Sequence, residues 1–339
     1  MKHFGLTLTS MAISLYNPFK NLNFNSQTCF LSGDKTNSPV EEITVFPQWL
    51  IDQFQLQQKP FKLLDESMTT YQDLKLPCAE WVKNEAINPL EEEIRTAFTS
   101  GYETVKDLPS IKLFQWISRI VYGIIYNEIR AGLHQQKIGG ESFQLAQGLI
   151  HKFGNLNLMM QSLLKPVEFE ENTPWSIRIF KVENSSETFN YRDEINTLTF
   201  TLGMNDFGII ACLQDHGTNA IYHSEILEKI SERVLKPIQF EELIARFYYS
   251  NYLFNRLPEY SILPTEELVY IEAMPLRGMS NKPLFDTWQV KPYAQVLENF
   301  WKPWGLTLFE IIKDPEKPLS FLVDKEGEFL RKISIPTPS

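Results

Sequence analysis

The residues best suited to chemistry are two cysteines, each at the head of a short turn-like stretch. Cys29 opens "CFLSGDK" and Cys78 opens "CAEWVKN". A metal-binding knuckle would need a second cysteine three positions after each, because a structural zinc ion is held by Cys and His ligands in a closed shell. Ser32 and Trp81 stand there instead. A serine hydroxyl binds zinc poorly and an indole not at all, so the sequence predicts no metal at this pair.

Several landmarks surround the two cysteines in a fixed order. "VFPQWL" lies between the two cysteines, and "TYQDLKLPC" ends at Cys78. "NPLEEEI" and "FQWISRIVYGIIYNEIRAGL" follow. In this order they resemble a bacterial family whose N-terminal module is similar to an HNH endonuclease. The later stretches "TPWSIRIFKV" and "FGIIACLQDHG" resemble the C-terminal body of that family, so the resemblance covers residues 25–220 or thereabouts.

The resemblance implies a zinc site and a catalytic site, both of which lack their key residues in this chain. The family uses four cysteines for the zinc ion, a histidine to activate water, and a later asparagine. The histidine position holds Thr44, whose hydroxyl is no general base at neutral pH, and the asparagine position holds Val82. We therefore predict no catalytic residue. The vestigial metal-site positions are Cys29, Ser32, Thr44, Cys78, Trp81 and Val82.

Three nearby polar residues offer alternative ligands. Glu41 and Glu42 precede Thr44, and Asn84 lies two positions beyond Val82. If folding brought these side chains together with a histidine, zinc or magnesium would be a cofactor and the chain an active metal-dependent nuclease or hydrolase. The sequence favours a solvated loop for the two glutamates, so we expect no cofactor.

Without a metal, the two cysteines are expected to pack against each other as small buried thiols. The Trp81 ring would then fill the volume of the missing metal and ligands. The resulting prediction is a catalytically inactive HNH-like protein that acts as a binding or interaction scaffold. Its partner is not specified by the sequence, since a protein and a nucleic acid both remain open.

Charge and composition limit the partner and the compartment. The net charge of −10, with no Lys/Arg cluster along the chain, opposes non-specific nucleic-acid binding. Three cysteines make no disulfide framework, which indicates a reducing compartment. No run approaches the roughly 18 apolar residues of a membrane helix, and residues 1–16 are expected to be extended. These features favour a cytoplasmic protein with no membrane partner.

Hydrophobic periodicity predicts the elements that position these residues. We expect helices over 47–56, from 89 onward with Asn88 as cap, over 108–133, over 141–164, over 221–234, over 240–254 and over 293–306. Gly123 in the central helix is expected to allow close packing. Strands are expected over 175–182, twice within 197–215, over 268–276, and as a hairpin over 319–333.

Other candidate residues have plainer interpretations. Glu91, Glu92 and Glu93 are expected to form a solvated first turn that favours the positive helix end. Asp215 and His216 fit a turn better than a general base, and Cys212 fits a core strand better than a nucleophile. Four aromatic residues have two interpretations: they line a groove that stacks a base or a small ligand, or they form the packed face of a helix, which we favour. These residues are Tyr248, Tyr249, Tyr252 and Phe254.

The fold class is therefore α+β, with three predicted segments. Residues 1–105 form a loop-rich HNH-like module of the ββα-metal type, without its zinc knuckles and with an N-terminal extension. Residues 106–168 form a helical segment. Residues 169–339 form a body of helices and mostly antiparallel sheet.

Overall fold

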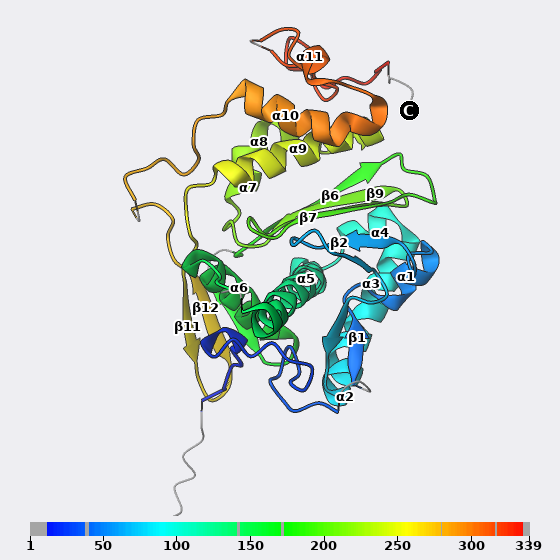
Figure 1. Ribbon diagram of the computed structural model, residues 1–339. Helices are drawn as coiled ribbons and strands as arrows, with labels where there is room; N and C mark the ends of the chain where they lie inside the picture. The colour runs from blue at the N-terminus through cyan, green and yellow to red at the C-terminus, as the bar shows by residue number, and fades with distance from the viewer. Residues whose placement is uncertain are drawn as a thin grey trace, which may run out of the picture.

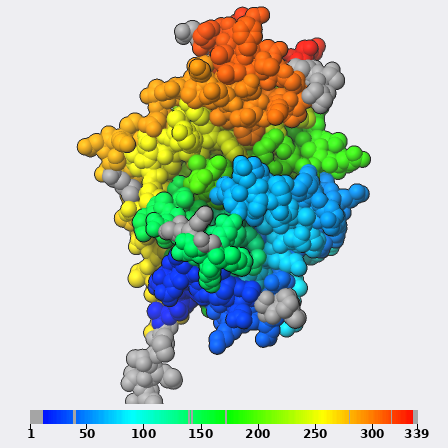
Figure 2. Space-filling model, in the orientation of Figure 1, coloured from blue at the N-terminus to red at the C-terminus, as the bar shows by residue number. Residues whose placement is uncertain are grey.

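A computed structural model describes residues 12–37, 41–140, 143–170, 173–278, 280–315 and 317–334. The chain is α+β, as predicted. A five-stranded sheet forms the middle layer, with α9 and α10 on one face and α5, α6 and the N-terminal segment on the other (Figure 1). The first described residues, in dark blue, and the described residues after 290, in orange to red, lie at opposite ends of the visible face (Figure 2).

The N-terminal segment is built from short strands and helices joined by turns. Strand β1 (Glu42–Thr44) pairs antiparallel with β4 (Lys75–Pro77), and β2 (Pro60–Lys62) pairs with β3 (Met68–Thr70). Helix α1 (Gln48–Gln53) follows β1 directly. After β4, the chain forms α2 (Glu80–Val82), a π-helical turn at Lys83–Ile87, α3 (Asn88–Ser100) and α4 (Tyr102–Lys106).

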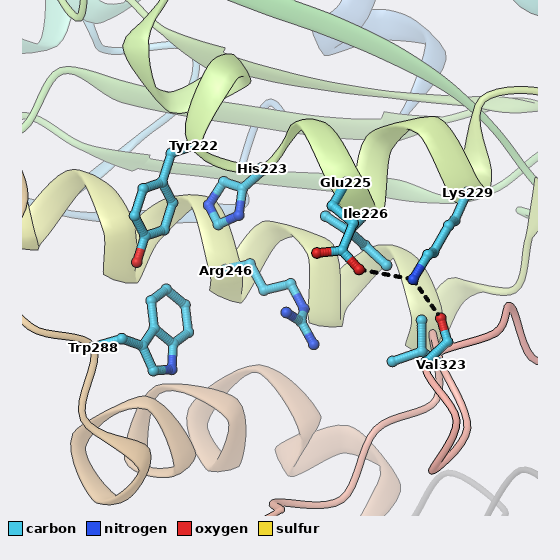
Figure 3. Close-up of a pocket in the computed structure, with 9 residues that line it drawn as sticks. Tyr222, His223, Glu225, Ile226, Lys229, Arg246, Trp288 and Val323 are labelled. Carbon is cyan, nitrogen blue, oxygen red and sulfur yellow. Dashed lines mark hydrogen bonds and ion pairs between the residues drawn. The ribbon is translucent and has the colours of Figure 1, made fainter.

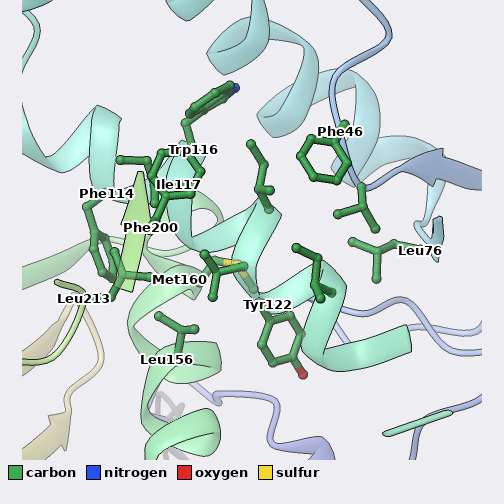
Figure 4. Packing of buried hydrophobic residues seen from close by; sticks show 14 of the residues in the cluster. Phe46, Leu76, Phe114, Trp116, Ile117, Tyr122, Leu156, Met160, Phe200 and Leu213 are labelled. Atoms are coloured by element: carbon green, nitrogen blue, oxygen red, sulfur yellow. The ribbon is translucent and has the colours of Figure 1, made fainter. Parts of the chain in front are cut away.

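Helix α5 (Ser110–Gly139) is the centre of the first core, and α6 (Gln147–Met160) packs beside it. Most residues of α5 from 113 to 129 are buried, because the N-terminal segment, α6 and the sheet surround this helix (Figure 4). Gly123 lies where a Cβ would come within 2.8 Å of Val45 and 3.1 Å of Leu76. The predicted close approach at this glycine is confirmed.

The central sheet has the strand order β10-β6-β9-β8-β7. Its strands are β6 (Ser176–Val182), β7 (Phe189–Glu194), β8 (Thr199–Met204), β9 (Phe207–Cys212) and β10 (Val234–Leu235). Alternate residues of β9 enter different cores, with Ile209 and Ala211 in the first and Ile210 and Cys212 in the second. Every residue of β8 and β9 is buried because helices cover both faces.

The second core lies on the other face of the sheet. It is formed by α8 (Ser224–Ile230), α9 (Pro237–Leu253), α10 (Val290–Trp301) and α11 (Leu308–Ile311). A separate sheet of β11 (Tyr260–Pro264), β12 (Val269–Ala273) and β5 (Val167–Glu170) packs against the first core. The two cores therefore share the central sheet as their common wall.

Most predicted elements are present, and the differences have local causes. Asn88 is not a helix cap, since the chain is already helical from Glu80 through the π-helical turn. The expected C-terminal hairpin is reduced to one bridge between Val323 and Phe329. After the N-terminal segment, strands β5, β7, β10 and β11 were not predicted, and the helix expected over 221–234 is broken at His223 and ends at Ile230, before β10. The expected extended stretch at 1–16 lies mostly outside the described residues, and 12–16 contain no strand.

Candidate functional site

The two candidate cysteines lie together at the edge of β4. The Phe30 backbone N–H donates to the Pro77 carbonyl at 2.9 Å, which places Cys29 beside Cys78, and both side chains are buried. The Cys78 thiol donates to the Ala79 carbonyl at 3.7 Å. Interaction with the neighbouring Cys78 thiol lowers the pKa of Cys29 to about 5, against the opposing effect of burial. Interaction with Cys29, together with burial, raises the pKa of Cys78.

The positions that follow the two cysteines do not complete a metal site. The Ser32 hydroxyl accepts a bond from the Asp34 backbone N–H at 3.3 Å, and the Trp81 indole N–H donates to the Asp34 carboxylate at 3.0 Å. Trp81 is 39% exposed, so the prediction that its ring fills buried volume is wrong. Its hydrogen bond to Asp34 keeps the ring at the surface, and the buried residue here is Val82.

The three alternative ligands point to different places. The Glu41 carboxylate accepts the Asn37 backbone N–H at 2.6 Å, whereas Glu42 lies 4.0 Å from the Lys75 ammonium. The Asn84 side chain is exposed and accepts a bond from Asn88 at 3.4 Å. Across the described ranges, no three His, Cys, Asp or Glu side chains are arranged to hold one metal ion.

A cavity of about 480 Å³ opens at Thr44, the position that the resemblance assigns to the catalytic histidine. We call it the Thr44 cavity. Strand β1, helix α1, the π-helical turn, α3 and α5 contribute its walls. It is lined by Glu42, Ile43, Thr44, Pro47, Gln48, Trp49, Gln72, Lys75, Lys83, Ile87, Asn88, Glu91 and Arg119.

The inner wall of the Thr44 cavity is fixed by Arg119 of α5, whose side chain is 1% exposed. Its guanidinium donates to the backbone carbonyls of Thr44 at 3.2 Å and Val45 at 3.1 Å, and it forms an ion pair with Glu91. Arg119 Nε is buried and has no hydrogen-bond partner in the described part of the chain. A buried guanidinium needs such partners because an unpaired buried charge is strongly destabilising.

Glu91 is the acidic partner of this network, and its predicted role as part of a solvated face is wrong. Its carboxylate accepts the indole N–H of Trp49 at 3.0 Å and of Trp116 at 3.3 Å, besides the bond from Arg119. Glu92 and Glu93 do form surface pairs, with Arg95 at 2.9 Å and Lys112 at 3.1 Å. The three consecutive glutamates therefore divide between cavity and solvent.

The charges of the Thr44 cavity are almost balanced. Arg119 pairs with Glu91 and Lys75 lies near Glu42, whereas no carboxylate among the described residues lies within ion-pair distance of the Lys83 ammonium. Amide side chains supply hydrogen-bond donors and acceptors, and Ile43, Pro47, Trp49 and Ile87 supply apolar surface. This mixture suits a polar chain segment better than a polyanion.

The remaining candidates are structural. Asp215 is buried and accepts bonds from Ser176 Oγ at 2.7 Å and from the Gly217 and Asn219 backbone N–H groups, so the predicted turn is confirmed. Cys212 is a buried residue of β9, also as predicted. His216 follows in the same turn at φ 50°. Within the described residues no helix is long and apolar enough to span a membrane.

Known proteins give no guide to the function of this chain. No protein-family model, curated protein or solved structure matches this chain. The resemblance to HNH endonucleases rests on the sequence landmarks alone.

The most informative residue that the sequence reasoning missed is Arg119. It stands alone among apolar residues in "FQWISRIVYGII", on the face of a helix predicted to be central. A lone arginine on a buried face requires a carboxylate or carbonyl partner, so the signal was present. The identity of the partner, Glu91, depends on tertiary packing and was not readable from spacing.

Proposed function

We propose that this chain is a binding scaffold that resembles HNH endonucleases in its N-terminal module but does not cleave nucleic acid. Its Thr44 cavity is the contact site for a partner protein. The resemblance assigns Thr44 to the position of the general base, and one observation supports the proposal: the carboxylates beside Thr44 are paired with the cations Lys75 and Arg119. A general base must accept a proton near neutral pH, which a threonine hydroxyl does not do.

The charge distribution favours a protein partner over a nucleic acid. Residues 1–105 carry eight Lys and Arg against thirteen Asp and Glu. Binding to phosphates draws its free energy from cations that displace counterions, and this segment has an excess of carboxylates. The amides and the apolar rim of the Thr44 cavity instead match the backbone and side chains of a polypeptide.

The test compares two neighbouring positions on the same π-helical turn. The photo-crosslinking residue p-benzoylphenylalanine replaces Lys83, which lines the cavity, or Glu85, which is exposed outside it. We expect a specific protein adduct in cells only from position 83. With that protein purified, Lys83→Glu should weaken binding by about tenfold or more and Glu85→Lys should not.

Two results would contradict the proposed interface. Equal adducts from both positions, or an affinity that Lys83→Glu leaves unchanged, would place the partner elsewhere. A nucleic-acid adduct at position 83 would replace the protein partner with a polynucleotide.

A further inference from the structure

A second cavity, of about 370 Å³, lies beside α8 and α9 (Figure 3), on the face of the central sheet opposite α5 (Figure 1). Its walls come from α7 (Thr218–Tyr222), α8, α9, the segment before α10 and the C-terminal segment. We call it the Trp288 pocket. It is lined by Tyr222, His223, Glu225, Ile226, Lys229, Arg246, Trp288, Val323 and Gly327.

One end of the Trp288 pocket is a pair of aromatic rings. The Tyr222 and Trp288 rings have centroids 6.2 Å apart and planes inclined by 23°. Trp288 is held from behind by Tyr249, with ring centroids 4.7 Å apart, and by Tyr293 at 4.6 Å. Tyr222 is 40% exposed and lies at the end of α7. The pocket therefore offers a fixed ring and a more accessible ring, both suited to stacking with a planar group.

Arg246 places a positive charge beside these rings (Figure 3). Its guanidinium donates to Glu242 at 3.0 Å and lies 5.7 Å from the centroid of the Tyr293 ring, and its Nε is buried with no partner among the described residues. The Glu242 carboxylate also accepts the backbone N–H groups of Phe321 at 2.6 Å and Leu322 at 3.1 Å. Arg246 therefore has its charge paired with Glu242 and keeps the Nε donor for a ligand.

The other polar groups of the pocket are already neutralised. Lys229 and Glu225 form a 2.8 Å ion pair, and the Lys229 ammonium also donates to the Gly327 carbonyl at 2.8 Å. His223 is buried and bonded to Ser250 Oγ at 2.9 Å. Burial, followed by the Arg246 charge, lowers the pKa of His223 to about 3, so its imidazole is neutral at pH 7. Arg246 is also ion-paired, with Glu242, but among the cations that line the pocket it is the one with a buried donor, Nε, that has no partner within the described residues.

We infer that the Trp288 pocket binds a small planar anion, an aromatic or heteroaromatic ring that carries a carboxylate or phosphate group. The ring packs against Tyr222 and Trp288 from the pocket side, because the 6.2 Å between their centroids is less than the roughly 7 Å that a ring inserted between them needs. The anionic group accepts a hydrogen bond from Arg246. A guanidinium matches the paired oxygens of both anions. The cavity volume falls in the range of sites for small organic ligands, which is roughly 300–1,000 Å³.

Calorimetric titration of the full chain with matched probe pairs tests this inference. Indole-3-acetate is compared with uncharged indole-3-ethanol, and adenosine 5′-monophosphate with adenosine. We expect the charged member of at least one pair to bind about tenfold or more tightly than its neutral analogue. The pair that shows this difference identifies the anion as a carboxylate or a phosphate.

Variants then locate the bound probe. Arg246→Met should weaken binding of the charged probe by about tenfold and leave the neutral analogue unchanged. Tyr222→Ala tests the same site at a partly exposed ring if Arg246→Met does not fold, and should weaken binding of both members by about fivefold. Tyr252→Ala is the control, because Tyr252 is 77% exposed on α9 and does not line the pocket.

Three results would overturn the inference. The first is the absence of saturable binding by all four probes up to about 1 mM. The second is equal affinity of charged and neutral members in both pairs. The third is an affinity that neither Arg246→Met nor Tyr222→Ala changes.

Discussion

At the residue scale, the decisive feature of the N-terminal segment is a buried ion pair where the resemblance places a catalytic centre. Arg119 is tied to Glu91 and to two backbone carbonyls of the β1–α1 connection. Such a network holds the wall of the Thr44 cavity rigidly, because each donor or acceptor that loses its partner is left buried and unsatisfied. The folded chain therefore fixes the shape of this cavity by itself.

Removing the acidic partner should be far more destabilising than removing its neighbour. Glu91→Leu leaves Arg119 buried without a countercharge, so we expect it to lower the free energy of unfolding by about 3–5 kcal/mol. Glu92→Leu removes only an exposed pair with Arg95 and should cost at most about 1 kcal/mol. Urea denaturation of both variants measures this. Equal effects would show that the buried network contributes little to stability.

The neutral histidine of the Trp288 pocket gives a pH-dependent prediction. The pKa of His223 falls from 6.5 to about 3 on folding, chiefly because the imidazole is buried. Below pH 6.5 the unfolded chain gains a proton there that the folded chain does not, so this histidine makes the protein less stable as the pH falls towards 3.

His223→Gln removes that titration and keeps a hydrogen-bonding side chain beside Ser250. Relative to wild type, the variant should gain up to about 1.4 kcal/mol of stability per pH unit as the pH falls from 6 to 4. Chemical denaturation at several pH values measures the difference, with His134→Gln on the exposed part of α5 as the control. A difference that is constant with pH would rule out a buried neutral imidazole.

At the element scale, close packing of α5 against β1 and β4 depends on one missing side chain. A Cβ on Gly123 would contact Val45 and Leu76, whereas a Cβ on Gly148 in α6 would meet no atom within 4 Å. Gly123→Ala should therefore destabilise the protein by about 1–3 kcal/mol through overpacking. Gly148→Ala should stabilise it by up to about 1 kcal/mol, because alanine favours a helix. Thermal unfolding of both variants measures the sign, and destabilisation by both would contradict this account of α5.

The sequence predicted best those elements whose buried residues form a clear apolar pattern. Helices α5 and α9 and strands β6, β8 and β9 were predicted because continuous or alternating apolar residues mark their buried faces. Strand β7, "FNYRDE", has six half-buried residues and no apolar alternation, so its pattern gave no signal. The helical start at Glu80 was missed because the π-helical turn joins two short patterns that read as separate elements.

Some residues of the candidate site were predicted from the sequence and others were not. Thr44 and Glu42 were singled out from their place among the landmarks, and both line the cavity. Arg119 reaches β1 from a position 75 residues later in the chain, a contact that periodicity and spacing do not encode. The Trp288 pocket likewise joins α7, α9 and the segment before α10. The high aromatic content of α9 was the only sequence signal for this pocket.

At the scale of the whole molecule, two cores share the central sheet. The carboxylate of Glu242 holds the C-terminal segment against helix α9. Glu242 on α9 accepts the Ser320 hydroxyl at 2.8 Å as well as the backbone N–H groups of Phe321 and Leu322. Its side chain is 1% exposed. Gln239 on the same helix donates to the Phe321 and Leu330 carbonyls, so the segment around residue 321 is held by side chains of α9 more than by strand pairing.

Glu242→Leu should release that segment. It removes the acceptor of two buried backbone N–H groups, so amide hydrogens of residues 317–330 should exchange about tenfold faster or more, while those of α5 change little. Hydrogen exchange followed by mass spectrometry measures this, with Glu228→Leu as the control for an exposed carboxylate on α8. Unchanged protection of residues 317–330 would contradict this role of Glu242.

The central claim is that the N-terminal module binds without cutting, and a nucleic-acid cleavage assay tests it most directly. Purified protein is incubated with double-stranded DNA, single-stranded DNA and RNA, each with magnesium, manganese or zinc. We predict no cleavage above a metal-only control with any substrate. Metal-dependent cleavage that Glu42→Ala abolishes and Glu92→Ala preserves would contradict the claim, and would make the Thr44 cavity the active site of a hydrolase with rearranged ligands.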